Sequence, residues 1–257
     1  MKIGKKIIKV KSCPSTNDTA KKMAVEGAEE GTVVLSEEQT RGKGTKGREW
    51  FSVRKKGIYA SIILRPPKPD ISLLPLIAAL AVRDAVFECL GISINLRWPN
   101  DLVWEEKKLG GILCESNFLG SVIDYVIVGI GLNVAHRRKD FPDEIVSKST
   151  SLSIITQRPI EISSLLGKLW QHLDRWYKLF LQDKEEEILK YFQKYSVFLL
   201  GQNLAIETAE GHIFGIYRGI DSRGRLCLEI SGDKRLFFAS QIMDIKESKE
   251  DGHAFSD

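Results

Sequence analysis

The sequence predicts an α+β protein, in which an antiparallel or mixed sheet carries long helices and a small β-rich unit follows near the C-terminal end. Three observations lead to this prediction. Four strand-like segments follow one another closely between residues 92 and 134, which disfavours a doubly wound parallel sheet. Long helical patterns flank them at residues 72–90 and 160–195. After Phe198 the chain changes to short alternating strands separated by glycine turns.

The N-terminal elements follow from short-range signals. Residues 7–10, IIKV, predict a strand, and Ser15 or Asn17 can cap the helix that follows. Residues 32–38, TVVLSEE, predict a buried strand that runs into a glycine-rich stretch. A second apolar strand at residues 57–64 ends where three prolines begin.

The remaining elements differ in how their apolar residues are spaced. Residues 72–90 are apolar nearly all round and predict a buried helix, whereas residues 136–148 are polar and predict a loop. Two amphipathic helices lie between residues 160 and 195, with a break near Gln182 and Asp183. We therefore expect a boundary near residue 197. The expected units are residues 1–197, a small barrel at residues 198–246, and a polar tail at residues 247–257.

Composition narrows the class of protein. The chain has 257 residues and a net charge of +4, which permits an anionic ligand without requiring nucleic acid. Its four cysteines form no CxxC pair, which argues against a zinc site and suits the reducing cytoplasm. We see no signal peptide, and no apolar run approaches the roughly 20 residues of a membrane span. We expect a cytoplasmic protein with no membrane partner.

The stretch QTRGKGTKGREW, residues 39–50, gathers glycines and cations. Its G-x-G-x-x-G letters lack the following helix that a dinucleotide-binding fingerprint needs, and it has no Walker spacing. Glycines let the backbone approach a ligand closely, while Lys43, Lys46 and Arg48 can neutralise phosphate. Trp50 offers a flat face on which adenine can stack. A solvated basic loop is the alternative that this stretch alone leaves open.

Two further segments combine strands with residues that strands rarely carry. In RWPNDLVWEEKKLGGILCES, Asn100 and Asp101 form a polar corner suited to a metal-bound phosphate, and Lys108 precedes paired glycines. A plain hairpin with a solvated Lys108 is the alternative. In VIVGIGLNV, residues 126–134, two glycines and Asn133 indicate that something packs closely against the strand, unless it contains a bulge.

Together these segments resemble those of biotin–protein ligases. The matching pieces are STND (15–18), EQTRGKGTKGREW (38–50), RWPND (97–101), KKLGGILCE (107–115), GIGLNV (129–134) and GIYRGID (215–221). The resemblance implies a catalytic domain related to class II aminoacyl-tRNA synthetases, with helices on one side of a mixed sheet, and a C-terminal SH3-like barrel. It also implies that the biotin carboxylate attacks the α-phosphorus of ATP, and that a lysine of a biotin carboxyl carrier domain then takes the biotin.

The resemblance assigns roles to individual residues, with Lys108 as the catalytic cation between the biotin carboxylate and the α-phosphate. It places biotin against Ser15, Thr16, Asn17, Gln39, Lys43, Gly44, Thr45, Lys108 and Gly111. It places ATP against Lys43, Arg48, Trp50, Asn100, Asp101, Asn133 and Arg218. Mg²⁺ is expected to bridge the phosphates, with Asn100 and Asp101 as its candidate protein ligands and several waters.

Two departures from the family qualify these expectations. The loop reads GKGTKGR where relatives often have GRGRxGR, so Thr45 replaces an arginine that helps some members to retain the adenylate. Since STND begins at residue 15, we expect a monofunctional enzyme without the DNA-binding domain of some relatives, and no specific DNA binding. The family leaves a homodimer open. The rival interpretations are a lipoate or octanoate ligase of the same fold, and a non-catalytic nucleotide- or RNA-binding module.

Overall fold

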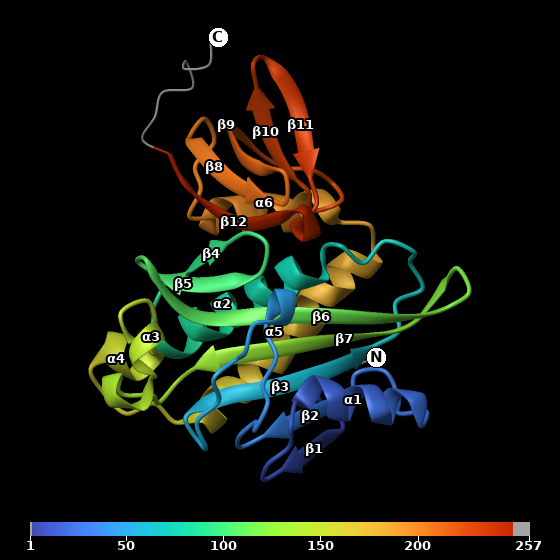
Figure 1. Ribbon diagram of the computed structural model, residues 1–257. Helices are drawn as coiled ribbons and strands as arrows, with labels where there is room; N and C mark the ends of the chain where they lie inside the picture. Colours follow the sequence, from blue (N-terminus) through green and yellow to red (C-terminus); the bar gives the residue numbers. More distant parts are fainter. Residues whose placement is uncertain (1, 249–257) are drawn as a thin grey trace.

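The computed structural model describes residues 2–248 and contains two β-sheets, the smaller lying above the larger in Figure 1. The larger sheet has seven strands in the order β1-β2-β3-β7-β6-β5-β4. Only β1 and β2 pair in parallel among these described strands, and every other neighbouring pair is antiparallel. The prediction of a mixed sheet is therefore confirmed. Its strands are β1 (Ile7–Val10), β2 (Val33–Ser36), β3 (Gly57–Leu64), β4 (Asn95–Arg97), β5 (Asp101–Trp104), β6 (Lys107–Leu119) and β7 (Val122–Asn133).

The helices divide between the two faces of this sheet. The long helices are α2 (Leu74–Leu90), α5 (Ile162–Leu181) and α6 (Glu185–Tyr195). They pack in one hydrophobic core with alternate residues of β3, from Ile58 to Leu64. Helix α1 (Thr16–Val25) packs on the opposite face, where Ala20 and Ala24 contact Ile63. The expectation of helices on one side thus holds for the long helices. Because the contacting residues of α1 are alanines, this helix can lie close to the sheet.

Two predictions about the helices are confirmed. Helix α2 is buried on nearly every side and ends at Gly91, which adopts the left-handed conformation (φ 71°) that favours glycine. Helices α5 and α6 are separated at Gln182 and Asp183, where the amphipathic pattern breaks. The sequence could predict both because each depends on local spacing.

The expectation of a plain loop at residues 136–148 is wrong. The segment contains a 3₁₀ turn η2 (Arg138–Asp140) and one helical turn α3 (Asp143–Val146), followed by α4 (Leu152–Thr156). His136 is fully buried and stacks on Phe141 with 5.1 Å between ring centroids. These two rings anchor a segment whose composition is otherwise polar, so the local hydrophilic pattern concealed its structure.

The smaller sheet is antiparallel and has the order β11-β10-β9-β8-β12. Its strands are β8 (Asn203–Thr208), β9 (Gly211–Ile220), β10 (Leu226–Ile230), β11 (Asp233–Phe237) and β12 (Ile242–Glu247), with a 3₁₀ turn η3 (Ala239–Gln241) before β12. A β-rich C-terminal unit is confirmed, but within residues 2–248 β11 and β12 are unpaired edges, so the sheet is not a closed barrel. Glu247, expected in the polar tail, ends β12. Ser248, the next residue of that predicted tail, donates its backbone N–H to Asn203 O at 2.9 Å, and residues 249–257 lie outside the described residues.

The two sheets meet beside the RWPND segment. Trp98 is almost fully buried, and its indole Nε1 donates to the carbonyl of Gly224, in the turn between β9 and β10, at 2.9 Å. Ser196, in the segment between α6 and β8, forms a bridge with Leu96 of β4. Trp98 of the RWPND motif therefore has a structural role, because it fixes the smaller sheet against the larger one. No helix between residues 2 and 248 is long and apolar enough to cross a bilayer.

Candidate active site

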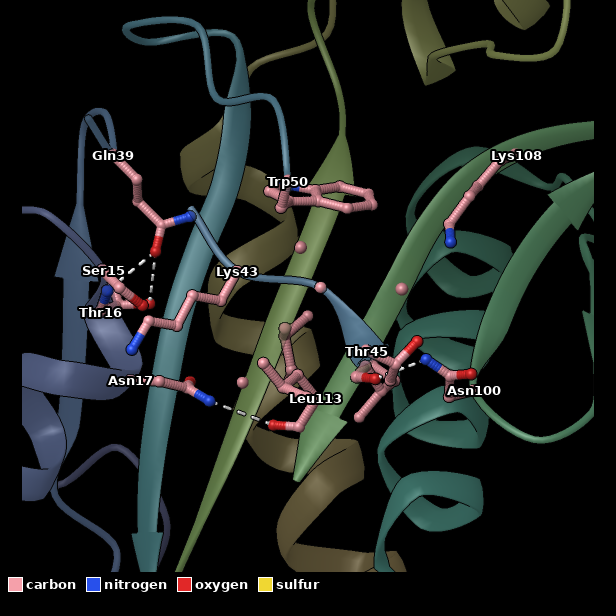
Figure 2. Close-up of a pocket in the computed structure, with 16 residues that line it drawn as sticks. Ser15, Thr16, Asn17, Gln39, Lys43, Thr45, Trp50, Asn100, Lys108 and Leu113 are labelled. Atoms are coloured by element: carbon pink, nitrogen blue, oxygen red, sulfur yellow. Dashed lines mark hydrogen bonds between the residues drawn. The ribbon is translucent and has the colours of Figure 1, made fainter. Parts of the chain in front are cut away.

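A pocket, partly open to solvent, lies over the strands of the larger sheet, between α1 and the glycine-rich loop (Figure 2). Eleven of its lining residues were expected from the sequence. They are Ser15, Thr16, Asn17, Gln39, Lys43, Gly44, Thr45, Trp50, Asn100, Lys108 and Gly111. Five others were not named as site residues and come from β6 and β7. They are Ile112, Leu113, Gly129, Ile130 and Gly131.

One end of the pocket is a network of uncharged polar groups. The Thr16 amide and hydroxyl both donate to Gln39 Oε1, at 2.8 and 3.1 Å, and Gln39 Nε2 donates to Ser52 Oγ at 3.0 Å. Beneath them the fully buried Ser61 Oγ lies 2.7 Å from Thr16 Oγ1 and 2.6 Å from Asn17 Oδ1. These hydrogen bonds fix each amide and hydroxyl in one orientation, which suits recognition of a small polar group.

The glycines of β7 are explained by the side chains that cross them. A Cβ on Gly129 would lie 2.3 Å from Asn17 Oδ1, and one on Gly131 would lie 2.5 Å from Trp50 Cε2. Both distances are far below van der Waals contact. The β6–β7 register is regular from Gly110 to Asn117, so a bulge does not account for them. The prediction of a close approach to this strand is confirmed.

Lys108 lies at the other end of the pocket. Its Nζ is 2.8 Å from Asp101 Oδ1 and 5.8 Å from the centroid of the Trp50 ring. Asn100 Nδ2 donates to the carbonyl of Ile112 at 2.7 Å, which fixes the corner before β5. Lys108 is 39% exposed, so its ammonium is oriented by Asp101 and still open to an anionic ligand.

The glycine-rich loop folds back on itself over the pocket. Gly44 N donates to Arg48 O at 2.7 Å, around the 3₁₀ turn η1 (Thr45–Gly47), and Trp50 N donates to Gly42 O at 2.9 Å. Lys43 Nζ pairs with Asp18 of α1 at 2.6 Å. As Figure 2 shows, Lys43 and Thr45 therefore lie across the pocket, on the loop in front of the strands.

Four expected ATP contacts do not line the pocket. Asp101 reaches it only through its ion pair with Lys108. Asn133 is buried and its Nδ2 donates to Thr150 O at 3.1 Å. Arg48 Nη2 donates to Met243 O at 3.1 Å, and Arg218 Nε donates to Glu229 Oε2 at 2.9 Å in the smaller sheet. Both arginines are occupied by protein acceptors here, so their contacts with phosphate stay predictions.

Two supporting residues were missed. Ser61 is the one small polar residue in the otherwise apolar and aromatic strand GIYASIIL, and a buried hydroxyl at such a position needs a hydrogen-bond partner. Glu115 accepts from Asn17 Nδ2 at 2.7 Å and pairs with Lys21, so it fixes which way the Asn17 amide points. Nothing local marks Glu115, because its partners are far away in sequence. Within residues 2–248 no cluster of three or more His, Cys, Asp or Glu could hold a metal ion.

Comparisons with known proteins agree with this geometry. Residues 10–133 match the Biotin/lipoate A/B protein ligase family. The chain is 34% identical over 228 residues to the bifunctional ligase/repressor BirA of Bacillus subtilis, covering 88% of this chain and 70% of that protein. It is 30% identical over 244 residues to the biotin–[acetyl-CoA-carboxylase] ligase of Mycobacterium tuberculosis, covering 90% of this chain and 86% of that protein.

A solved structure extends the likeness to three dimensions. The biotin protein ligase of Aquifex aeolicus in complex with biotin and ATP superposes with a TM-score of 0.83 at 28% identity, covering 95% of this chain and 100% of the other. The match therefore includes both sheets, and not only the part of the chain that carries the motifs.

Proposed function

This chain belongs to the biotin–protein ligase family, and we propose that the pocket of Figure 2 is where it joins biotin to ATP. The enzyme is a biotin–[acetyl-CoA-carboxylase] ligase. One observation carries the assignment of the site. Residues of five separate segments of the chain, from STN to GIG, line a single pocket, in which a few polar and charged groups converge.

The reaction has two steps that need charge neutralisation more than a protein nucleophile. A biotin carboxylate oxygen attacks the α-phosphorus of ATP, the bond to pyrophosphate breaks, and biotinyl-5′-adenylate forms. A lysine amine of the acceptor then attacks the activated carbonyl, loses a proton and releases AMP. In both steps negative charge gathers where carboxylate and α-phosphate meet.

We assign Lys108 to that meeting point, because its ammonium is at one end of the pocket and the uncharged network is at the other. The network of Thr16, Asn17 and Gln39 offers donors and acceptors that suit the ureido ring of biotin. Lipoate carries a dithiolane at that end, which makes no comparable hydrogen bonds, so the geometry favours biotin. Lys43, Gly44 and Thr45 would then cover the linkage between the two substrates.

The nucleotide is proposed to enter as MgATP. Asn100 and Asp101 can supply at most a few oxygen ligands, since Asp101 Oδ1 already pairs with Lys108 and no larger acidic cluster lies within residues 2–248. An ion held mainly by phosphates and water fits such a donor set, and it would neutralise charge on the leaving pyrophosphate. Arg48 and Arg218 are the further cations proposed for the phosphates.

The proposed acceptor is a lysine of a biotin carboxyl carrier domain, as the name of the Mycobacterium tuberculosis relative suggests. The test is transfer of label to such a domain with MgATP and biotin, repeated with lipoate. We expect biotin-dependent pyrophosphate release and labelling, with lipoate at least 100-fold poorer. Equal transfer of lipoate would show that the protein is a lipoate ligase. Binding of nucleotide without turnover would show that it is a binding module.

A further inference from the structure

The glycine-rich loop touches the smaller sheet through two cations. Lys46 Nζ donates to the carbonyl of Ile242 and, at 3.3 Å, to that of Met243. Arg48 Nη2 donates to the same Met243 carbonyl at 3.1 Å. Both acceptors belong to β12, an edge strand that lies on the side of the smaller sheet facing the larger unit in Figure 1.

The local structure of β12 explains why these carbonyls accept side-chain donors. Pairing of β12 with β8 shifts register between Ile242 and Asp244, which leaves Met243 as a bulge. A bulged residue on an edge strand is unpaired in the ladder, and its carbonyl needs another donor. The ammonium and guanidinium groups of the loop supply these donors.

The loop is held on its other side by α1, through the ion pair between Lys43 and Asp18. The segment from Lys43 to Thr45, which begins at the first attachment and precedes the second, lines the pocket. We call residues 43–45 the roof of the pocket. The roof is attached to α1 on one side and to β12 on the other, so the loss of either attachment can shorten the time for which the roof stays closed.

Lys46 also adopts an uncommon backbone conformation. Its φ of 59° lies in the left-handed region, which non-glycine residues rarely occupy unless their surroundings hold them there. Lys46 remains an exposed residue, and partial burial together with the neighbouring Arg48 lowers the pKa of its ammonium. The left-handed backbone places the side chain, and its hydrogen bonds to the two carbonyls hold it against β12.

We propose that Lys46 is a positioning residue that fastens the roof of the pocket to β12, so that the smaller sheet controls retention of the bound intermediate. This role differs from direct neutralisation of phosphate, because the Lys46 donors point to backbone carbonyls of β12. The identity of the retained molecule, biotinyl-adenylate, rests on the proposed function, whereas the attachment itself does not.

The test compares Lys46→Met, which keeps the length of the side chain and removes its donors, with Lys46→Arg, which restores a cation. Lys55→Met is a matched control, since Lys55 also has a left-handed φ of 58° and is exposed nearby, outside the pocket lining. Hydrogen exchange reports closure of the roof through the loop amides of residues 42–50. Release of free biotinyl-adenylate reports retention, and saturation with MgATP separates KM from kcat.

For Lys46→Met we expect about three- to tenfold faster exchange in the loop and a similar increase in adenylate release, the scale of one lost hydrogen-bonded attachment. The rate of adenylate formation at saturating MgATP should stay within about twofold, Lys46→Arg should restore both readouts, and Lys55→Met should change neither. Unchanged loop exchange in Lys46→Met overturns the proposal. So does a raised KM for ATP with normal exchange, which would make Lys46 a phosphate contact. If wild-type protein forms no adenylate, the proposed function fails, and loop exchange still decides the attachment.

Discussion

Lys108 Nζ lies 2.8 Å from Asp101 Oδ1, across neighbouring strands β6 and β5. The two side chains are 39% and 25% exposed, and ion pairs with such access to water contribute only about 0–1 kcal/mol to stability. Lys108 can therefore exchange Asp101 for the carboxylate and phosphate of the substrates at a small cost in free energy. Asp101 orients the ammonium towards the place where the negative charge of the reaction is expected to develop.

Removing this cation should stop adenylate formation. For Lys108→Ala we expect biotin-dependent pyrophosphate release to fall by about 100- to 1000-fold in kcat, because electrostatic stabilisation of the transition state is lost. Lys107→Ala is the control, since Lys107 is the neighbouring cation on β6 and does not line the pocket. Retention of a tenth or more of wild-type activity in Lys108→Ala would contradict the assigned role.

A methyl group at Gly131 should displace Trp50. The added Cβ would lie 2.5 Å from the indole, so for Gly131→Ala we expect KM for biotin or ATP to rise at least tenfold. Gly167→Ala serves as the comparison, because Gly167 is exposed on α5 with no atom within 4 Å of its notional Cβ. That variant should keep full activity and gain about 0.5–1 kcal/mol in unfolding free energy. Normal kinetics in Gly131→Ala would show that Trp50 does not shape the site.

An arginine at position 45 should slow the escape of the intermediate. Thr45 lies in the roof of the pocket, where a guanidinium can pair with the phosphate of the adenylate. We expect Thr45→Arg to reduce release of free biotinyl-adenylate by about threefold or more, with adenylate formation little changed. Thr45→Val, of similar size and without charge, should not reduce release. Equal release from native and Thr45→Arg protein would end the idea that Thr45 makes this enzyme leaky.

Stability should fall in mild acid because of His136. Burial of the ring, aided by Lys56 and opposed by Asp140, lowers the pKa of His136 from 6.5 to about 4. Between pH 6.5 and pH 4 the unfolded chain binds a proton at this histidine and the folded protein does not. The contribution of His136 to the free energy of unfolding is therefore complete above pH 6.5 and is lost as pH falls towards 4. The full difference corresponds to roughly 3 kcal/mol.

Denaturant unfolding at pH 7.5 and pH 4.5 measures this dependence. His136→Gln should be less stable at pH 7.5, since it disturbs a buried ring, and should lose roughly 2–3 kcal/mol less than wild type on acidification. His212→Gln, at an exposed position in β9, should follow the wild-type profile. Equal acid sensitivity of wild type and His136→Gln would show that His136 does not set this dependence.

The sequence by itself determined the elements and the chemistry of the site. The spacing of apolar residues predicted α2, the break between α5 and α6 and the mixed sheet, and glycines within apolar strands marked a close approach. These features depend on interactions within a few residues, or on the need to bury one face, so they can be recognised in a linear pattern. Eleven of the expected site residues, between Ser15 and Gly111, accordingly line one pocket.

The tertiary structure decided which residues meet. The partners of Lys108, Asn17 and Lys46 depend on strand register and on how the smaller sheet packs against the larger one. For the same reason Arg48 and Arg218 bond to protein groups instead of lining the pocket, and Glu115 was not foreseen. Local spacing limits what a residue can do, but contacts between distant segments exist only once the whole chain has folded.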